Sequence, residues 1–173
     1  LTKMNIEPNV EEEIKKHDEK IAFAEANFGD TEVRDAIFDK AAFYQQVGDH
    51  PNAIKTYDLA LKKSVGVSKR LEVQFKLLQI YLNQKDLTNI KASIDKCKKF
   101  LEEGGDWEGR NKLKVYEGIY DIMVRNFAHA ANLFLDAVTT FNSPEILSYN
   151  DLIFYTVLTS MVSLDRADIR KRV

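Results

Sequence analysis

The sequence contains few of the residues that build disulfide-linked, many-stranded or membrane-spanning proteins. Among its 173 residues is one cysteine, Cys97, which excludes an internal disulfide framework and a zinc site made only of cysteines. Three prolines and seven glycines are too few for the many turns of a sheet-rich fold. No apolar run reaches the ~18 residues that a membrane-spanning helix needs. The first residues lack the apolar stretch of a secretory signal peptide, so we expect none.

Patterns that mark common catalytic and nucleotide-binding sites are also missing. Gly104-Gly105 is not followed by the Gly-Lys-Ser/Thr of a phosphate-binding loop and instead predicts a helix end. Glu13 and His17 lie four residues apart, but without a second histidine or cysteine nearby an ordinary side-chain pair is the simpler interpretation. The other histidines look structural, and Cys97 occupies a packing position, so we expect a buried, inert thiol. We therefore predict no enzyme, no cofactor and no metal site.

The net charge of −2 conceals an uneven distribution along the chain. Residues 1–60 carry −6 (7 basic, 13 acidic), residues 61–114 carry +6 (13 basic, 7 acidic) and residues 115–173 carry −2 (5 basic, 7 acidic). This pattern favours oriented docking to a protein partner over nucleic-acid binding, which usually needs an overall basic domain. Ordinary solvation of helix faces explains the pattern equally well.

Apolar residues recur at helical spacing in every long segment, so we predict an all-α protein. A polar helix should cover 8–28 and end at Gly29 in a left-handed cap. Shorter helices of about 14–18 residues, joined by short turns, should follow and pair as hairpins. The predicted start and stop signals are Asp30-Thr31, the turn 48–51, Gly66 with Ser68, the turn 83–86, the turn 104–106 with Asp106 as a cap, Ser143-Pro144-Glu145, the capping box Ser148/Asp151, and Asp165 with Asp168.

A small–aromatic–small pattern repeats three times along the chain. Its first copy, Ala53-x3-Tyr57-x2-Ala60, is followed by related copies at 90–97 and 130–137, which are offset by 37 and 40 residues. Small residues let paired helices approach closely, which is the tetratricopeptide (TPR) layout with its repeat of about 34 residues. We predict a right-handed α-solenoid, with Lys85 replacing the turn glycine in the second copy and a slip of about one residue in the third turn. Tyrosines at matching positions of the preceding helices complete the pattern: Tyr44, Tyr81 and Tyr120.

Four stretches resemble one family. Residues 102–116, which include Gly104-Gly105-Asp106-Trp107, resemble a PCI-family non-ATPase subunit of the 26S proteasome lid, the paralogue of the first COP9 signalosome subunit. Residues 29–36, 130–141 and 155–157 are similar to the same subunit, so that the resemblance covers about 10–173. The Gly-Gly-Asp-Trp stretch favours the lid subunit over its signalosome relative. The resemblance implies an N-terminal helix at 1–29, then TPR-like repeats at 30–173 that lead into a truncated PCI region without its winged helix.

The resemblance also implies a function. It implies a non-catalytic scaffold that supports assembly of the regulatory particle and ubiquitin-dependent degradation, in the cytoplasm and the nucleus. The implied partners are other PCI-family lid subunits, with the lid deubiquitinase and ATPase-ring subunits as further candidates, and neither nucleic acid nor membrane. The alternatives are a signalosome subunit or a free TPR adaptor that captures an acidic peptide. The adaptor needs lysine and asparagine near positions that Phe38 and Ala42 occupy.

Two features are candidate contact sites for such partners. Trp107 is either a packing wedge, which is the simpler interpretation, or a partner anchor, because tryptophan is enriched at interface hot spots. Basic residues cluster at the ends of two helices and the starts of the next, and helix dipoles disfavour cations at the starts. We predict that they form one docking edge for an acidic surface: Lys62, Lys63, Lys69, Arg70, Lys96, Lys98, Lys99, Arg110, Lys112 and Lys114.

Overall fold

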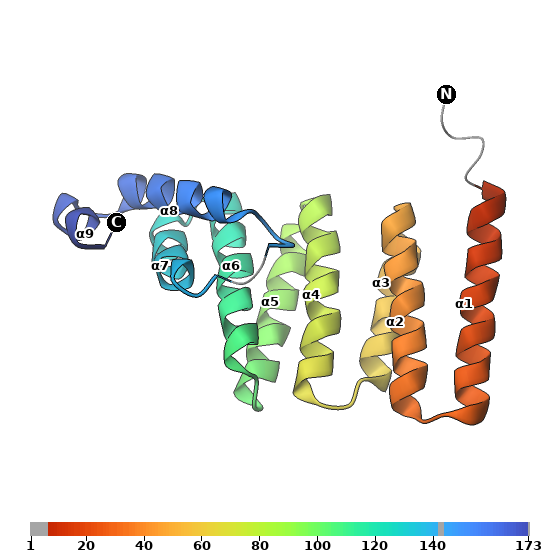
Figure 1. The fold of residues 1–173 in the computed structure, drawn as a ribbon. Coiled ribbons are helices and arrows are strands. Elements are labelled where there is room, and N and C mark those ends of the chain that lie inside the picture. Colours follow the sequence, from red (N-terminus) through yellow and green to blue (C-terminus); the bar gives the residue numbers. More distant parts are fainter. Residues whose placement is uncertain (1–6, 142–143, 173) are drawn as a thin grey trace. The chain divides into compact units, whose positions relative to one another are not determined.

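The computed structural model describes residues 7–141 and 144–172, and the regular structure in these ranges is entirely helical (Figure 1). The all-α prediction is therefore confirmed. None of the helices is long and apolar enough to cross a membrane, as far as the described residues show. The described residues form nine helices: α1 (Glu7–Asn27), α2 (Asp30–Val47), α3 (His50–Lys63), α4 (Val67–Gln84), α5 (Leu87–Glu102), α6 (Trp107–Met123), α7 (Phe127–Val138), α8 (Tyr149–Ser163) and α9 (Arg166–Arg172).

The helices group into two compact units, Leu1–Ile80 and Tyr81–Val173, with α4 running through the boundary. In the N-terminal unit α2 packs against both α1 and α3. An ion pair of 2.5 Å between Lys40 Nζ and Asp18 Oδ1 also joins α1 to α2. In the C-terminal unit α6 packs against α5 and α7, and α7 packs against α8. Each unit thus consists of neighbouring helices that are consecutive in the sequence, as short connections require.

The repeated small–aromatic–small pattern forms the core of both units, as predicted. Each of its residues is buried to 1% exposure or less, so the small side chains do stand at close helix contacts. The helices also pack closely where Gly118 of α6 faces Phe134 of α7, because a Cβ at Gly118 would lie 2.5 Å from the ring. The pattern residues are Ala53, Tyr57, Ala60, Ile90, Ile94, Cys97, Ala130, Phe134 and Ala137.

The three hairpin turns share one backbone conformation. A residue in the left-handed region occupies the same place in each turn: Gly48 (φ 89°), Lys85 (φ 57°) and Arg125 (φ 62°). Each lies five residues before the first small residue of its pattern, so the predicted slip in the third turn is wrong. The following amide donates to the carbonyl of Tyr44, Tyr81 and Asp121 respectively, at 2.7–3.0 Å. Asp121, and not Tyr120, is therefore the counterpart of the two tyrosines.

Most of the predicted helix signals are confirmed. Asp106 Oδ1 accepts the amide of Gly109 at 2.8 Å, and Ser148 and Asp151 form the predicted capping box. The carbonyl of Asp165 accepts the first amide bonds of α9, including that of Asp168 at 2.9 Å. These signals are local, since each of these bonds joins groups only three or four residues apart.

Three predicted signals are wrong. Gly29 is extended (φ −89°, ψ 179°) and not left-handed, and α2 begins at Asp30 without a side-chain cap, so Asp30-Thr31 does not cap it. The end of α1 is satisfied differently, because the amide group of Asn27 donates to the carbonyl of Phe23 at 2.9 Å. Pro144-Glu145 lies in a turn, since the capping box at Ser148 starts the helix later; Ser143 lies outside the described residues.

Candidate protein interaction surfaces

Four of the predicted basic residues gather around the α3–α4 turn of the N-terminal unit. Lys62 is exposed, and no ion pair of its own appears among the described residues. The other three contact oxygen atoms of the same unit, so this turn does not present a bare positive surface. The contacts are Lys63 Nζ with Asp30 Oδ1 at 3.1 Å, Lys69 Nζ with Asp35 Oδ1 and Glu72 Oε2 at 3.8 Å each, and Arg70 Nε donating to the carbonyl of Ser64 at 3.4 Å.

A buried arginine holds this turn in place. The side chain of Arg34 is 3% exposed, and its guanidinium lies 4.7 Å from the centre of the Phe38 ring. The guanidinium also donates charge-assisted hydrogen bonds, which are stronger than bonds between neutral groups, and these bonds join α2 to the turn and to α4. The guanidinium donates to Ser64 Oγ at 3.3 Å, to the carbonyl of Lys69 at 3.2 Å, to Glu72 Oε2 at 2.7 Å and to Asp35 Oδ1 at 2.6 Å.

Sequence reasoning missed Arg34, although a signal was present. Arg34 stands at helical spacing with Ile37, Phe38 and Ala41, on the apolar face of α2. A charged residue on an apolar face predicts a buried ion pair, since burying an unpaired charge is costly. The partners themselves come from the following turn and helix, which the spacing does not reveal.

The other six basic residues lie at the end of α5 and in the first half of α6, within the C-terminal unit. Lys96 and Lys99 are exposed and form no ion pair among the described residues. The remaining four contact acidic side chains or a carbonyl on neighbouring segments. These contacts are Lys98 Nζ with Glu117 Oε1 at 2.5 Å, Lys114 Nζ with Asp136 Oδ2 at 3.7 Å, Lys112 with Glu145, and Arg110 Nη2 donating to the carbonyl of Leu101 at 3.0 Å.

A groove of about 310 Å³ separates the end of α5 from the start of α6. Leu101 and Leu113 line it with buried apolar side chains, and charged groups of both signs surround them. Such a groove suits an apolar side chain flanked by polar groups better than a purely acidic segment. The charged lining residues are Lys98, Glu102, Arg110, Lys114 and Glu117.

Trp107 stands at the first position of α6, three residues before Arg110, which lines the groove. Its side chain is 63% exposed, so the favoured interpretation as a packing wedge is wrong. Asp106 fixes the backbone at this point through its bond to the amide of Gly109. A large apolar side chain on a fixed helix start is well placed to contact a partner. That role remains a prediction.

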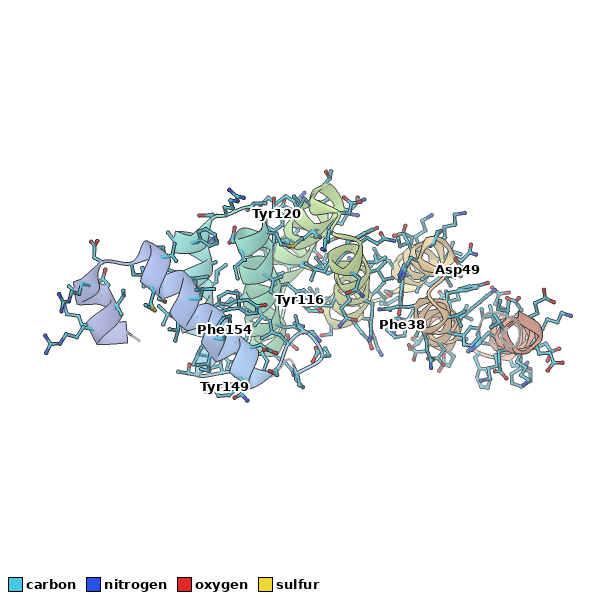
Figure 2. The ribbon with its side chains drawn as sticks, turned by 90° about the horizontal axis from the view of Figure 1, so that it is seen from above. Phe38, Asp49, Tyr116, Tyr120, Tyr149 and Phe154 are labelled. Carbon is cyan, nitrogen blue, oxygen red and sulfur yellow. The ribbon has the colours of Figure 1, made fainter. Side chains whose placement is uncertain are left out.

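The largest run of exposed apolar side chains lies on α8. Phe154, labelled on this helix in Figure 2, is 61% exposed, and Met161 and Val162 are exposed to a similar degree. The opposite side of α8 is buried through Leu152 and through polar groups such as Thr156, whose hydroxyl donates to the carbonyl of Leu152 at 2.7 Å. The exposed side of α8 is therefore a second candidate contact surface.

Three residues considered for chemistry have structural environments. Burial raises the pKa of the Cys97 thiol to about 12, so little of the reactive thiolate forms near neutral pH. Glu13 accepts a bond from Lys16 at 2.6 Å, and the ring of His17 lies 5.4 Å from that of Phe43. Glu13 is therefore engaged by a lysine, and His17 contacts an aromatic ring.

Comparison with known proteins shows one family over nearly the whole chain. Residues 3–172 match the family model described as 26S proteasome subunit RPN7. The chain is 48% identical over 163 residues to the 26S proteasome non-ATPase regulatory subunit 6 homolog of Arabidopsis thaliana, covering 94% of the chain and 42% of that protein. It is 34% identical over 164 residues to the 26S proteasome regulatory subunit RPN7 of Saccharomyces cerevisiae, covering 94% of the chain and 38% of that protein.

The chain is also similar, at lower identity, to a subunit of the COP9 signalosome. COP9 signalosome complex subunit 1 of Emericella nidulans is 25% identical over 138 residues, or 75% of the chain and 27% of that protein. Its lower identity agrees with the expectation, drawn from the Gly-Gly-Asp-Trp stretch, that the proteasome relatives are nearer. The chain spans about two fifths of the length of the proteasome relatives.

Proposed function

Because the chain belongs to the RPN7 family of 26S proteasome subunits, we propose that it serves as a non-catalytic structural part of the proteasome lid. In this role it supports assembly of the regulatory particle and ubiquitin-dependent protein degradation, in the cytoplasm and the nucleus. Its partners are other lid subunits, with the lid deubiquitinase and the ATPase ring as further neighbours. The family match over residues 3–172 is the observation that carries the proposal.

The architecture suits a scaffold. Hairpins with fully buried small residues hold their helices at fixed spacing, so that surface residues keep defined positions relative to one another within each unit. We infer a right-handed stacking of the hairpins from the repeat pattern, as in other TPR-like solenoids. A regular series of hairpins of this kind presents extended surfaces, and assembly subunits need such surfaces.

The basic residues contribute to docking by exchanging partners. Exposed ion pairs contribute only about 0–1 kcal/mol each, so a partner's carboxylate can displace an internal one at little cost. Lys62, Lys96 and Lys99 need no such exchange. In each unit the basic residues therefore orient an approaching acidic surface, while apolar contacts such as Trp107 supply affinity.

The free-adaptor alternative is less well supported. Figure 2 labels Phe38, the position at which a peptide clamp would need a polar residue. The ring of Phe38 lies 5.4 Å from the ring of Tyr57 and beneath the Arg34 guanidinium. An aromatic ring engaged in this way has no group that binds a peptide carboxylate.

Affinity purification of the full-length protein from its own cells tests the proposal. We expect lid and ATPase-ring subunits to co-elute in stoichiometric amounts. Co-elution with signalosome subunits alone, or with no stable assembly, would contradict a role in the proteasome.

Charge reversal tests the basic docking residues separately. The triple variant K62E/K96E/K99E leaves the internal ion pairs intact and should reduce incorporation into the particle, most strongly at low salt, because added salt screens the attraction that these substitutions remove. The matched control is K15E/K20E/K55E, which makes the same change in charge at exposed lysines outside the predicted edge. Equal incorporation of both variants would reject the edge as an interface.

A further inference from the structure

The turn between α6 and α7 brings together three side chains of the kinds that bind metal ions. Glu117 and Asp121 stand one helical turn apart on α6, and His129 lies in the first turn of α7. Their ligand atoms all lie within 4.8 Å of one another, and His129 Nδ1 is 2.5 Å from Asp121 Oδ2. No other group of this kind was found among the described residues.

This group distinguishes the third hairpin from the first two, although all three share one backbone turn. Asp121 stands where the other turns have Tyr44 and Tyr81, and His129 stands where they have asparagine. The third turn has also lost the side-chain cap that the others share, because Asn126 makes no cap bond. In the first two turns the capping carboxylates of Asp49 and Asp86 accept the backbone N–H of Asn52 and Asn89, at 3.3 and 3.1 Å respectively. Each carboxylate also accepts the side-chain amide of the same asparagine at 2.7 Å.

The Asp121 carboxylate lacks a permanent counter-charge. Its side chain is only 7% exposed, and burying a carboxylate without a cation is costly. Within the described part of the chain its partners are the Asn126 amide at 3.3 Å and the His129 ring. A neutral imidazole provides a hydrogen bond but no formal charge, whereas a divalent cation shared with the imidazole would balance the carboxylate.

We propose that Glu117, Asp121 and His129 bind a divalent transition-metal ion, with zinc as the ion to test. Carboxylate oxygen and imidazole nitrogen are ordinary zinc ligands at about 2.0–2.2 Å. His129 is half exposed, so its ring has room to turn toward a shared ion. The bound ion connects α6 to α7 and has a structural role, with the remaining coordination positions left to water.

Lys98 competes with the metal for Glu117. Its Nζ lies 2.5 Å from Glu117 Oε1, so the ion must displace the ammonium group before Glu117 can coordinate. This competition gives the proposal a distinctive consequence. Removing the lysine charge should tighten metal binding, while removing the imidazole should weaken it.

Isothermal titration of the untagged protein with zinc chloride tests the site. We expect one ion per chain in the wild type, and a dissociation constant at least about tenfold higher in His129→Ala, since even the loss of an outer-shell partner costs about 10–100-fold. Lys98→Met should lower the dissociation constant. His50→Ala, a histidine in the first turn of another helix, is the matched control and should bind as the wild type does.

Histidine ring signals in the NMR spectrum identify the ligand directly. The chain has three histidines, so the signal that His129→Ala removes is assigned by its loss. That signal should be the one that shifts when zinc is added. The proposal is overturned if the wild type binds no zinc, if His129→Ala binds as tightly as the wild type, or if Lys98→Met leaves the affinity unchanged.

Discussion

Replacing Gly118 by alanine tests the close packing of α6 against α7. An added Cβ would lie 2.5 Å from Cε1 and 2.8 Å from Cζ of Phe134, whereas ordinary contact begins near 3.4 Å. The ring or the helix must therefore move by roughly 0.9 Å to restore contact distance. Phe134 is fully buried with Ala130 and Leu152, so this displacement passes to neighbouring core residues.

Two effects of opposite sign determine how much Gly118→Ala changes the free energy of unfolding. Alanine in a helix interior is favoured over glycine by about 1 kcal/mol. Overpacking a close-packed core costs about 1–3 kcal/mol, and a contact as short as 2.5 Å to a ring without free space belongs in the upper half of that range. We expect a net loss of about 1–2 kcal/mol in the free energy of unfolding, or about 2–4 °C in Tm for each kcal/mol.

Urea denaturation followed by circular dichroism measures this loss. Phe134→Leu provides the control, because the smaller side chain leaves room for the new methyl group. In that background Gly118→Ala should become neutral or stabilising. A gain of about 1 kcal/mol from Gly118→Ala in the wild-type background, as expected from helix propensity alone, would refute the packing argument.

Three further predictions concern other parts of the fold. Lys85→Gly should raise stability by about 1 kcal/mol in a thermal melt, because Lys85 has φ 57°, while Lys91→Gly inside α5 should lower stability by a similar amount. Arg34→Met should cost about 2–3 kcal/mol, because several charge-assisted bonds are lost together, and an unchanged urea midpoint would contradict this. With the pKa of Cys97 raised to about 12, a thiol reagent at pH 8 should react far more slowly with the folded chain than with the unfolded one, and equal rates would show an accessible thiol. Because the folded chain holds the thiol proton more tightly than the unfolded chain, this group stabilises the fold. Its contribution to the free energy of unfolding is fully present below the ordinary thiol pKa and declines as pH rises from there toward 12.

The helices were predictable because their signals are local. The caps at Asp106 and Ser148, and the spacing of the buried small and aromatic residues, depend only on neighbours within one or two turns. The error in the third turn has a physical reason. Lys85 and Arg125 adopt the left-handed conformation without the glycine that normally marks it. The sequence therefore contains no marker for the third turn, and the prediction matched Tyr120 to Tyr44 and Tyr81 where the structure matches Asp121.

The contact sites were only partly predictable. The positions of the basic residues along the helices follow from the sequence, but several of their partners come from other helices that the spacing does not identify. Lys114 contacts Asp136 of the next helix, and Lys63 contacts Asp30 of an earlier one. The exposure of Trp107 has the same origin, since nothing in its own helical turn determines whether another helix covers it.

The pairing of the basic residues changes how docking should depend on charge. Residues 61–114 carry a net charge of +6, yet many of their cations already contact carboxylates or carbonyls of the same unit. A partner that offers carboxylates to these cations exchanges one exposed ion pair for another, which contributes little net free energy. In the proposed docking, the charges therefore act mainly on orientation and association rate, and the affinity comes mainly from apolar contact. The exposed side chains of Trp107 and α8 are then the residues whose truncation should weaken assembly most.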